Sequence, residues 1–219
     1  MTAVYAIPIA AVNPDDGQAR AHISRDRLEW IDRRHGSARV QSFAATLLLE
    51  YAIAQIFPSV VHPLAISIAD GGKPYLVREA GIHFSLSHSG AWAVCAVGDH
   101  PLGVDIERCE PNRPDIASRF FHKEEVRYLN GLPGYARPDA FYSLWTLKEA
   151  FVKTTGRGLD LPLRSFCVDL RGARPRLEDC DDPRSYSLFR LPFSADRDYR
   201  LAVCVQQANA DAPILQVLN

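Results

Sequence analysis

Two carboxylates near the middle of the chain, Asp105 and Glu107, have the spacing of side chains on one face of a β-strand. They close the stretch 103–107, which follows the apolar run 92–97. Ionised carboxylates roughly 6–7 Å apart repel by about 2–3 kcal/mol at an effective dielectric of about 20. Solvation, neighbouring basic groups or a divalent cation would relieve this repulsion. A solvated strand end is the ordinary interpretation of such a pair, so by itself it predicts no metal site.

A second cluster, Trp145–Lys153, carries chemically useful side chains at helical spacing. Trp145, Glu149 and Lys153 recur every four residues and form one stripe along a helix, with Lys148 beside it. A glutamate and a lysine on one stripe usually form an exposed ion pair worth a few tenths of a kcal/mol. The tryptophan indicates instead a face turned toward other atoms, because its large ring favours partial burial.

Two turns offer groups that bind phosphate. In the stretch 84–90, Ser87 and His88 combine a hydroxyl, an imidazole and the free N–H groups of a turn. The glycine-rich loop 71–75 carries Lys73. A polar turn and a common surface loop are the ordinary alternatives. Glu125 could join an acidic site, although glutamates are also common in the first turn of a helix.

Taken together, these clusters form a set with a definite chemistry. Glu149 could complete Asp105 and Glu107 as an oxygen-ligand site of the kind that Mg²⁺ uses with substrate phosphates. The phosphates would then have basic partners available: Lys73, His88, Lys148 and Lys153. This combination of acidic and basic side chains is typical of an enzyme that acts on a phosphorylated small molecule by metal-assisted displacement.

Composition sets limits on the class of protein. The chain has 219 residues, of which 47% are hydrophobic and 23% charged, as expected for a globular protein with a substantial core. A net charge of −1 argues against a nucleic-acid binder. The five cysteines are scattered without metal-site spacing, which suits a reducing compartment. No apolar run reaches membrane-spanning length, so we expect a cytoplasmic protein without a membrane partner.

Apolar periodicity and turn residues predict the elements that position these side chains. Helices are expected over 24–34, 37–57, 113–130 and 138–154. Strands are expected over 3–10, 64–68, 82–87, 91–97, 102–107, 165–170, 186–190, 200–205 and 214–218. The short connections between 82 and 107 favour antiparallel pairing there. Because helices and strands occur in blocks, the predicted fold class is α+β.

The motifs resemble, in their order and spacing, those of the 4′-phosphopantetheinyl transferases, specifically the longer surfactin-synthetase-activating (Sfp) type. The resemblance spans about residues 70–170 and rests on five motifs: G-K-P-Y (72–75), F-S-L-S-H-S-G (84–90), G-V-D-I-E (103–107), R-F-F-x-x-x-E (119–125) and W-T-L-K-E-A-F-V-K (145–153). It implies a pseudo-dimeric fold of two similar lobes, each with an antiparallel sheet and helices. We expect lobes at 1–103 and 104–219, with the active site in the cleft between them.

The resemblance also implies an activity. Such enzymes transfer 4′-phosphopantetheine from coenzyme A to a serine of an apo acyl or peptidyl carrier protein, and release adenosine 3′,5′-bisphosphate. Metal ligands for Mg²⁺, or Mn²⁺ in its place, would be Asp105, Glu107 and Glu149. Coenzyme A contacts would be Lys73, Ser87, His88, Lys148 and Lys153. Catalytic residues would be Glu149, Lys153 and Asp105, where Glu149 or a metal-linked water removes the serine proton. A monomer with internal pseudo-two-fold symmetry is expected.

Some features depart from the resemblance or leave choices open. Many relatives carry an arginine where this chain has Gln41, so Arg33, Arg34 or Arg39 would have to contact the 3′-phosphate of coenzyme A. The basic, Phe-containing region 113–137 is the expected carrier surface, because such carriers are acidic. Two alternatives are a Mg²⁺-dependent nuclease-like phosphodiesterase, which would favour the Glu and Lys on a strand, and a non-catalytic coenzyme A or carrier-binding module.

Overall fold

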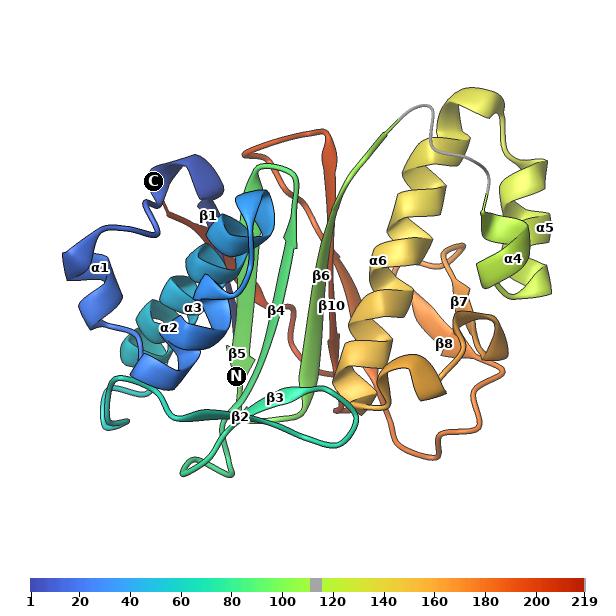
Figure 1. Ribbon diagram of the computed structural model, residues 1–219. Helices are drawn as coiled ribbons and strands as arrows, with labels where there is room; N and C mark the ends of the chain where they lie inside the picture. The colour runs from blue at the N-terminus through green and yellow to red at the C-terminus, as the bar shows by residue number, and fades with distance from the viewer. Residues whose placement is uncertain (111–115, 219) are drawn as a thin grey trace.

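Two β-sheets packed face to face form the centre of the molecule, a computed structural model that describes residues 1–110 and 116–218 (Figure 1). The first sheet is four-stranded, in the order β11-β1-β5-β4. Its strands are β1 (Thr2–Pro8), β4 (His83–Ser89), β5 (Trp92–Gly98) and β11 (Ile214–Val217).

The second sheet is three-stranded, in the order β6-β10-β9, and is antiparallel throughout. Its strands are β6 (Leu102–Arg108), β9 (Ser187–Leu191) and β10 (Tyr199–Val205). Two small antiparallel pairs accompany the sheets: β2 (Ile66–Ile68) with β3 (Pro74–Leu76), and β7 (Cys167–Asp169) with β8 (Arg176–Glu178).

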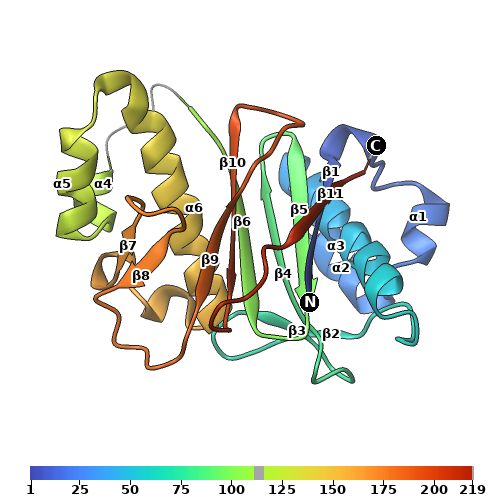
Figure 2. The ribbon, with the colours of Figure 1, turned by 180° about the vertical axis from the view of Figure 1, so that it is seen from behind.

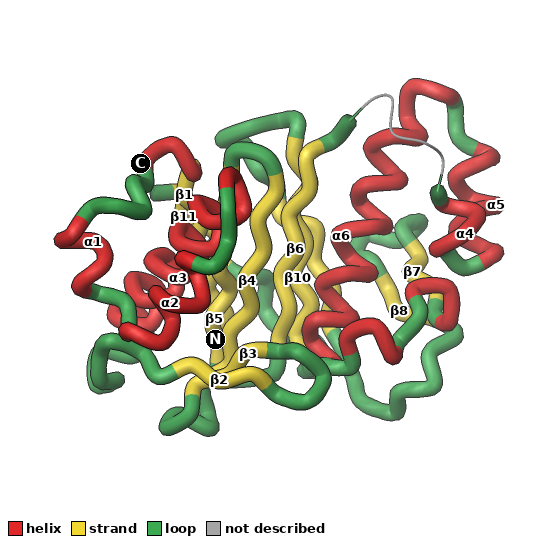
Figure 3. Tube along the Cα trace, viewed as in Figure 1, coloured by secondary structure: helices red, strands yellow, loops and turns green. Residues whose placement is uncertain are grey.

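Two long helices cover the outer faces of the sheets, α3 (Gly36–Ile56) on the first and α6 (Arg137–Thr155) on the second (Figure 3). The shorter helices are α1 (Gly17–Ala21), α2 (Arg25–Asp32), α4 (Ala117–Phe120) and α5 (Lys123–Gly131). Single 3₁₀ turns lie at Ile9–Ala11, Gly134–Ala136, Gly158–Asp160 and Leu163–Ser165. Within the described residues no helix has both the length and the apolar character needed to span a membrane.

Alternation along β6 determines which side chains enter the core. Val104 and Ile106 are buried between the two sheets, where they join Val94 and Ala96 of β5. Asp105 points to the opposite face, toward α6. The strand pattern predicted from the sequence is confirmed here, because period-two alternation places apolar and acidic side chains on opposite faces.

The α+β class is confirmed, but two strand neighbours differ from expectation. The pairing predicted for 82–107 holds for β4 with β5, yet β6 leaves that sheet and pairs with β10, Val104 opposite Val203. The final strand, β11, pairs in parallel with β1 of the first sheet (Figure 2). A short connection does not fix strand pairing when a distant apolar strand offers a better partner, and sequence proximity cannot reveal a parallel partner from the other end of the chain.

The division into lobes at 1–103 and 104–219 stays a prediction. The predicted boundary falls inside β6, and the strand 214–217 belongs to the sheet of the first half. The helix predicted at 113–130 is described only from residue 116, as α4 and α5; its first residues lie outside the described part of the chain.

Candidate active site

The site is built where β4 of the first sheet lies beside β6 of the second (Figures 1 and 3). Three serines of β4 point across to β6, and their hydroxyls accept hydrogen bonds from β6 backbone N–H groups at 3.1–3.4 Å. The donors are Val104 for Ser85, Ile106 for Ser87 and Arg108 for Ser89. We call this row of contacts the serine seam; it joins the two sheets through side chains.

Asp105 lies at the middle of the serine seam and is only 5% exposed. Its Oδ1 accepts hydrogen bonds from Ser87 Oγ at 2.8 Å and from Lys153 Nζ at 2.7 Å. Its Oδ2 is buried and has no hydrogen-bond partner. An unpartnered buried carboxylate oxygen is costly, typically about 1–3 kcal/mol and more when charged, so this oxygen is a candidate metal ligand.

Glu107 lies one side-chain position further along the same face of β6. Its Oε2 accepts a hydrogen bond from Ser89 Oγ at 2.8 Å, and Glu107 takes part in a further interaction besides this one. The face shared by Asp105 and Glu107, predicted from the sequence, therefore exists, and each carboxylate is hydrogen-bonded by a serine of the neighbouring strand.

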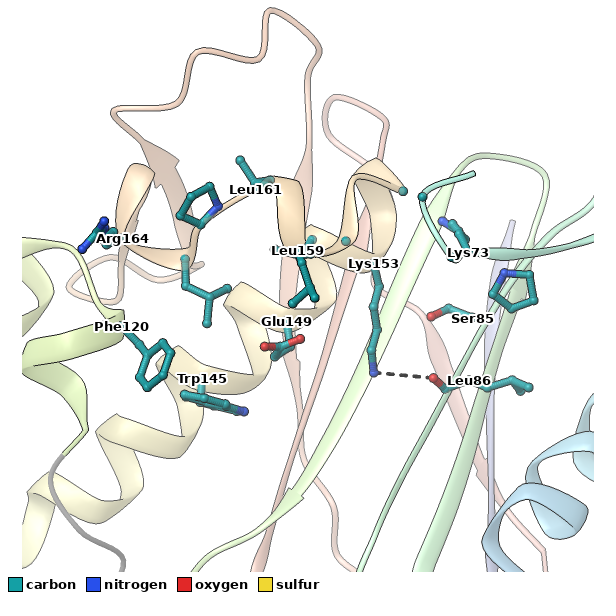
Figure 4. Close-up of a pocket in the computed structure, with 18 of the residues that line it drawn as sticks. Lys73, Ser85, Leu86, Phe120, Trp145, Glu149, Lys153, Leu159, Leu161 and Arg164 are labelled. Atoms are coloured by element: carbon teal, nitrogen blue, oxygen red, sulfur yellow. Dashed lines mark hydrogen bonds between the residues drawn. The ribbon is translucent and has the colours of Figure 1, made fainter. Parts of the chain in front are cut away.

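Helix α6 brings the third carboxylate to this face. It packs tightly on β6 because Gly103 has no side chain: a Cβ there would lie 2.1 Å from Ala150 O. Trp145, Glu149 and Lys153 all line the same cavity, so the predicted stripe is confirmed (Figure 4). Lys153 reaches across to the seam and donates to Val104 O at 3.1 Å as well as to Asp105.

Burial raises the pKa of Glu149 above its usual value, and the negative charge of Asp105 adds to the effect. Lys153 opposes this shift, and Glu107 contributes a smaller increase. The other two predicted carboxylates therefore act electrostatically on Glu149. A glutamate with a raised pKa is better suited to accept a proton near neutral pH than an ordinary one.

A cavity of about 660 Å³ opens above Glu149 and Lys153. Figure 4 shows that its wall comes from both halves of the chain, with Lys73 and Ser85 on one side and Phe120 and Arg164 on the other. Most of the remaining lining is apolar: Phe84, Leu86, Trp145, Val152, Leu159, Leu161 and Leu163, with prolines and glycines. Such a cavity suits a ligand with an extended, largely uncharged portion and polar ends.

Lys148 does not belong to this site, so the prediction that it contacts coenzyme A is wrong. The side chain is fully buried, and its ammonium lies 2.6 Å from Glu125 Oε1 and 2.7 Å from Phe166 O. Glu125 also caps α5 by accepting from His122 N and holds Val168 N. Both residues are therefore structural. Lys148 faces away from the cavity because it lies one position before Glu149 on α6, and one position turns a side chain by about 100°.

Lys73 and His88 differ in their availability. Lys73 Nζ donates to Leu102 O at 2.8 Å and to Thr154 O at 3.3 Å, and burial lowers its pKa to about 8. The His88 side chain is exposed to solvent. Its pKa is lowered mainly by the packing around the ring and next by the positive charge of Lys153. The Ser87 hydroxyl donates to Asp105 Oδ1 and accepts from Ile106 N, and its contact with coenzyme A stays a prediction.

The arginines that could contact the 3′-phosphate of coenzyme A differ in the groups that they already contact. Arg39 forms ion pairs with Asp15 at 2.7 Å and with Asp32 at 3.0 Å. The guanidinium of Arg34 lies 3.3 Å from the centre of the Trp30 ring, and its positive charge reaches His88. Arg34 is thus the candidate whose positive charge acts on His88, a predicted coenzyme A contact.

The residues present fit a Mg²⁺ ion that is completed by its substrate. Among the residues that the structure describes, no three His, Cys, Asp or Glu side chains are assembled closely enough to hold a metal alone. Mg²⁺ usually takes only one or two carboxylates and fills its remaining positions with water and substrate phosphate. The buried free oxygen of Asp105 provides such a ligand.

Comparisons with known proteins agree with this chemistry. The family model of the 4'-phosphopantetheinyl transferase superfamily matches residues 101–204. A 4'-phosphopantetheinyl transferase of Bacillus subtilis is 35% identical over 201 residues, which cover 90% of this chain and 87% of the relative. The 4'-phosphopantetheinyl transferase Sfp of Bacillus subtilis (strain 168) is 37% identical over 76% of this chain and 73% of its own length.

The chain therefore belongs to the 4'-phosphopantetheinyl transferase superfamily and is similar to its Sfp members. A solved structure of holo-[acyl-carrier-protein] synthase (AcpS) from Thermotoga maritima aligns with 50% of this chain and 64% of that chain. That alignment has 19% identity and a TM-score of 0.41, an overlap too limited to add to the assignment.

Proposed function

We propose that this enzyme transfers 4′-phosphopantetheine from coenzyme A to a serine of an apo acyl or peptidyl carrier protein and releases adenosine 3′,5′-bisphosphate. The observation that carries the proposal is the buried, unpartnered Oδ2 of Asp105. The other oxygen of this carboxylate accepts from Lys153, which lines the same cavity as Glu149. A half-satisfied carboxylate beside a lysine that lines a mostly apolar cavity suits a phosphorylated substrate with a long uncharged arm.

Asp105, Glu107 and Glu149 would hold a Mg²⁺ ion, or Mn²⁺ in its place. When bound, the ion neutralises charge on the pyrophosphate of coenzyme A and stabilises the charge that develops on the departing phosphate. The serine seam keeps two of these carboxylates in place before the ion arrives.

In the transfer, the carrier serine oxygen forms a bond to the phosphorus of the pantetheine phosphate while the bond from that phosphorus to the oxygen of the departing nucleotide breaks. Glu149 accepts the serine proton, which its raised pKa favours. Lys153 holds Asp105 and presents positive charge to the pyrophosphate. The enzyme contributes mainly position and preorganised charge.

The remaining parts of coenzyme A would follow the lining of the site. The pantetheine arm would occupy the apolar cavity between Phe84 and Leu161. The 3′-phosphate would lie near His88 and Arg34; the positive charge of Arg34 contributes to the lowered pKa of His88. Lys73 borders the cavity and would act there with its pKa near 8.

The carrier would dock on the face formed by α4 and α5. Arg119, Lys123 and Arg127 are exposed there, and Phe120 borders the cavity. Residues 111–115 of the surface predicted from the sequence lie outside the described part of the chain. The free state of all five cysteines supports the cytoplasm, where coenzyme A occurs, as the site of action, and we expect a monomer.

The nuclease alternative is disfavoured by one observation: Glu149 and Lys153 lie on α6, whereas that alternative expects them on a strand. A purely binding module is disfavoured by the raised pKa of Glu149 among neighbouring carboxylates, because converging negative charge serves no purpose in a passive binder.

Incubation with coenzyme A, Mg²⁺ and a panel of apo carrier domains tests the proposal. Intact-protein mass spectrometry should show one added phosphopantetheine on the carrier serine, and chelation of the metal should abolish it. Asp105→Ala and Glu149→Ala should fold yet transfer nothing. Failure of the wild type on acyl and peptidyl carriers alike would contradict the proposal, and DNA cleavage with Mg²⁺ would favour the nuclease instead.

A further inference from the structure

We infer that Ser89, together with Ser87, is a positioning residue that orients the Glu107 and Asp105 carboxylates toward the metal; this inference rests on the proposed function. Each serine acts through the carboxylate that it holds. The evidence is a contact pattern that repeats along the serine seam.

The pattern relates each serine to two groups of β6. Ser87 Oγ donates to Asp105 Oδ1 at 2.8 Å and accepts from Ile106 N at 3.4 Å. Ser89 Oγ donates to Glu107 Oε2 at 2.8 Å and accepts from Arg108 N at 3.1 Å. In both cases the carboxylate lies 18 residues after the serine and the N–H donor 19 residues after it.

A hydroxyl has one proton to donate, and the backbone determines where that proton goes. Because a β6 N–H group points at the oxygen lone pair, the hydroxyl proton is directed away from it and toward the carboxylate. One oxygen of the carboxylate is thereby fixed, which also fixes the position of the other. In Asp105 this second oxygen is the buried Oδ2 that has no partner.

Outer partners of this kind tune a metal site because they fix the rotamer of the ligand before binding. Here the same hydroxyls also join the two sheets, since β4 and β6 belong to different sheets and contact each other through these side chains. The orientation of the carboxylates is therefore coupled to the fit between the two sheets.

Ser85 provides a matched control inside the same seam. Its hydroxyl accepts from Val104 N at 3.1 Å, as the other two accept from β6. The position that would carry its carboxylate, 18 residues further on, is Gly103. Loss of the Ser85 hydroxyl therefore removes a seam contact and leaves both carboxylates with their serines.

The test measures binding of Mn²⁺ in the presence of coenzyme A, by electron paramagnetic resonance of free Mn²⁺, so that no turnover is required. Ser89→Ala should weaken Mn²⁺ binding about 10- to 100-fold, as loss of an outer hydrogen bond typically does. At saturating coenzyme A, Ser85→Ala should leave Mn²⁺ binding unchanged, because Ser85 borders the cavity but holds no carboxylate. Ser85→Ala should lower the melting temperature by about 2–4 °C, because it loses one hydrogen bond of the seam. Ser89→Ala should lower it further, because it also loses the bond to Glu107.

Two further variants separate orientation from folding. Ser89→Thr keeps the hydroxyl on a strand that accepts β-branched residues, so it should restore Mn²⁺ binding. Ser89→Cys keeps a similar volume but donates weakly, so it should bind Mn²⁺ poorly even if Ser89→Ala does not fold. In a Glu107→Gln background, Ser89→Ala should have almost no additional effect on Mn²⁺ binding.

Mn²⁺ binding by Ser89→Ala as tight as that of the wild type would overturn the inference, as would an equal loss in Ser85→Ala. Both results leave the proposed function intact if wild type still modifies a carrier. A wild-type protein that binds no Mn²⁺ in the presence of coenzyme A would overturn the proposed metal site and this inference together. The proposed function fails separately, if the wild type modifies no carrier.

Discussion

Helix α6 carries two lysine–carboxylate pairs that look alike in sequence and differ in what they can do. Lys148 pairs with Glu125 at 2.6 Å, and the two side chains are 0% and 1% exposed. Lys153 pairs with Asp105 at 2.7 Å, and the two side chains are 30% and 6% exposed. Along α6, only five positions thus separate a fully buried pair from a pair at the boundary of the two sheets.

The pairs differ most in how completely their polar atoms are satisfied. Both oxygens of Glu125 are hydrogen-bonded, to Lys148, Val168 N and His122 N, and Lys148 also donates to Phe166 O. In the other pair, Asp105 Oδ2 has no partner. A fully satisfied buried pair holds elements together, whereas a half-satisfied one at the edge of a cavity is free to bind a ligand.

The largest effect should come from Asp105→Asn. Loss of the negative charge removes a metal ligand and with it several kcal/mol of transition-state stabilisation. The rate of transfer to the carrier should therefore fall on the order of 10⁴-fold. The melting temperature should change little, because Asn can keep the contact with Ser87. Carrier modification followed by mass spectrometry checks the first expectation, and calorimetry the second; a fully active variant would remove Asp105 from the site.

Glu149→Gln should lower kcat about 10²- to 10⁴-fold, the usual contribution of a general base. The raised pKa of Glu149 has two further consequences. In the wild type, activity should decline in acid at a higher pH than an ordinary glutamate would give. The folded state also holds this proton more tightly than the unfolded state, so stability is lost as pH rises through the folded pKa, and the variant should be more stable than wild type at neutral pH.

A pH–rate profile and thermal melts at several pH values check these expectations. Glu149→Asp is the matched control, because it keeps the charge but shortens the reach. A variant that loses both activity and stability at neutral pH would contradict the assigned role.

Lys148→Met should leave the chemistry intact and damage the fold. Removal of one partner of a buried pair typically costs about 3–5 kcal/mol, which for a chain of this size corresponds to a decrease of roughly 6–20 °C in melting temperature. Below its melting transition the variant should still modify carriers. The double variant Glu125→Leu/Lys148→Met should recover part of the stability, since well-packed apolar residues can replace such a pair. Loss of activity in a fully folded Lys148→Met would contradict the structural role.

The smallest expected effect concerns the carrier surface. Lys123→Glu on α5 should raise KM for an acidic carrier a few-fold with little change in kcat, and should flatten the dependence of kcat/KM on salt. Arg190→Glu, an exposed cation on β9, is the control and should behave as wild type. Kinetics that do not depend on salt would argue against this surface.

Much of the site could be predicted because local periodicity decides it. Alternation placed Asp105 and Glu107 on one face of a strand, and the four-residue repeat placed Trp145, Glu149 and Lys153 along one cavity wall. Both patterns depend only on the geometry of a single element.

What the sequence alone did not reveal depends on contacts between elements. Lys148 and Lys153 are equally plausible phosphate ligands until the packing of α6 shows which one faces Phe166. The parallel partnership of β1 with β11 joins the two ends of the chain and leaves no local signal. Alternating serines on β4 were a visible signal for a polar seam, but only the position of β6 shows what they hold.

A crystal of the enzyme with Mn²⁺ and coenzyme A, measured at a wavelength where manganese scatters anomalously, tests the contrast between the two pairs most directly. The account predicts an anomalous peak bonded to Asp105 Oδ2, with Lys148 and Glu125 still paired and no peak beside them. A manganese bound elsewhere with Asp105 Oδ2 still unpartnered, or bound at Glu125 with Lys148 displaced, would contradict it.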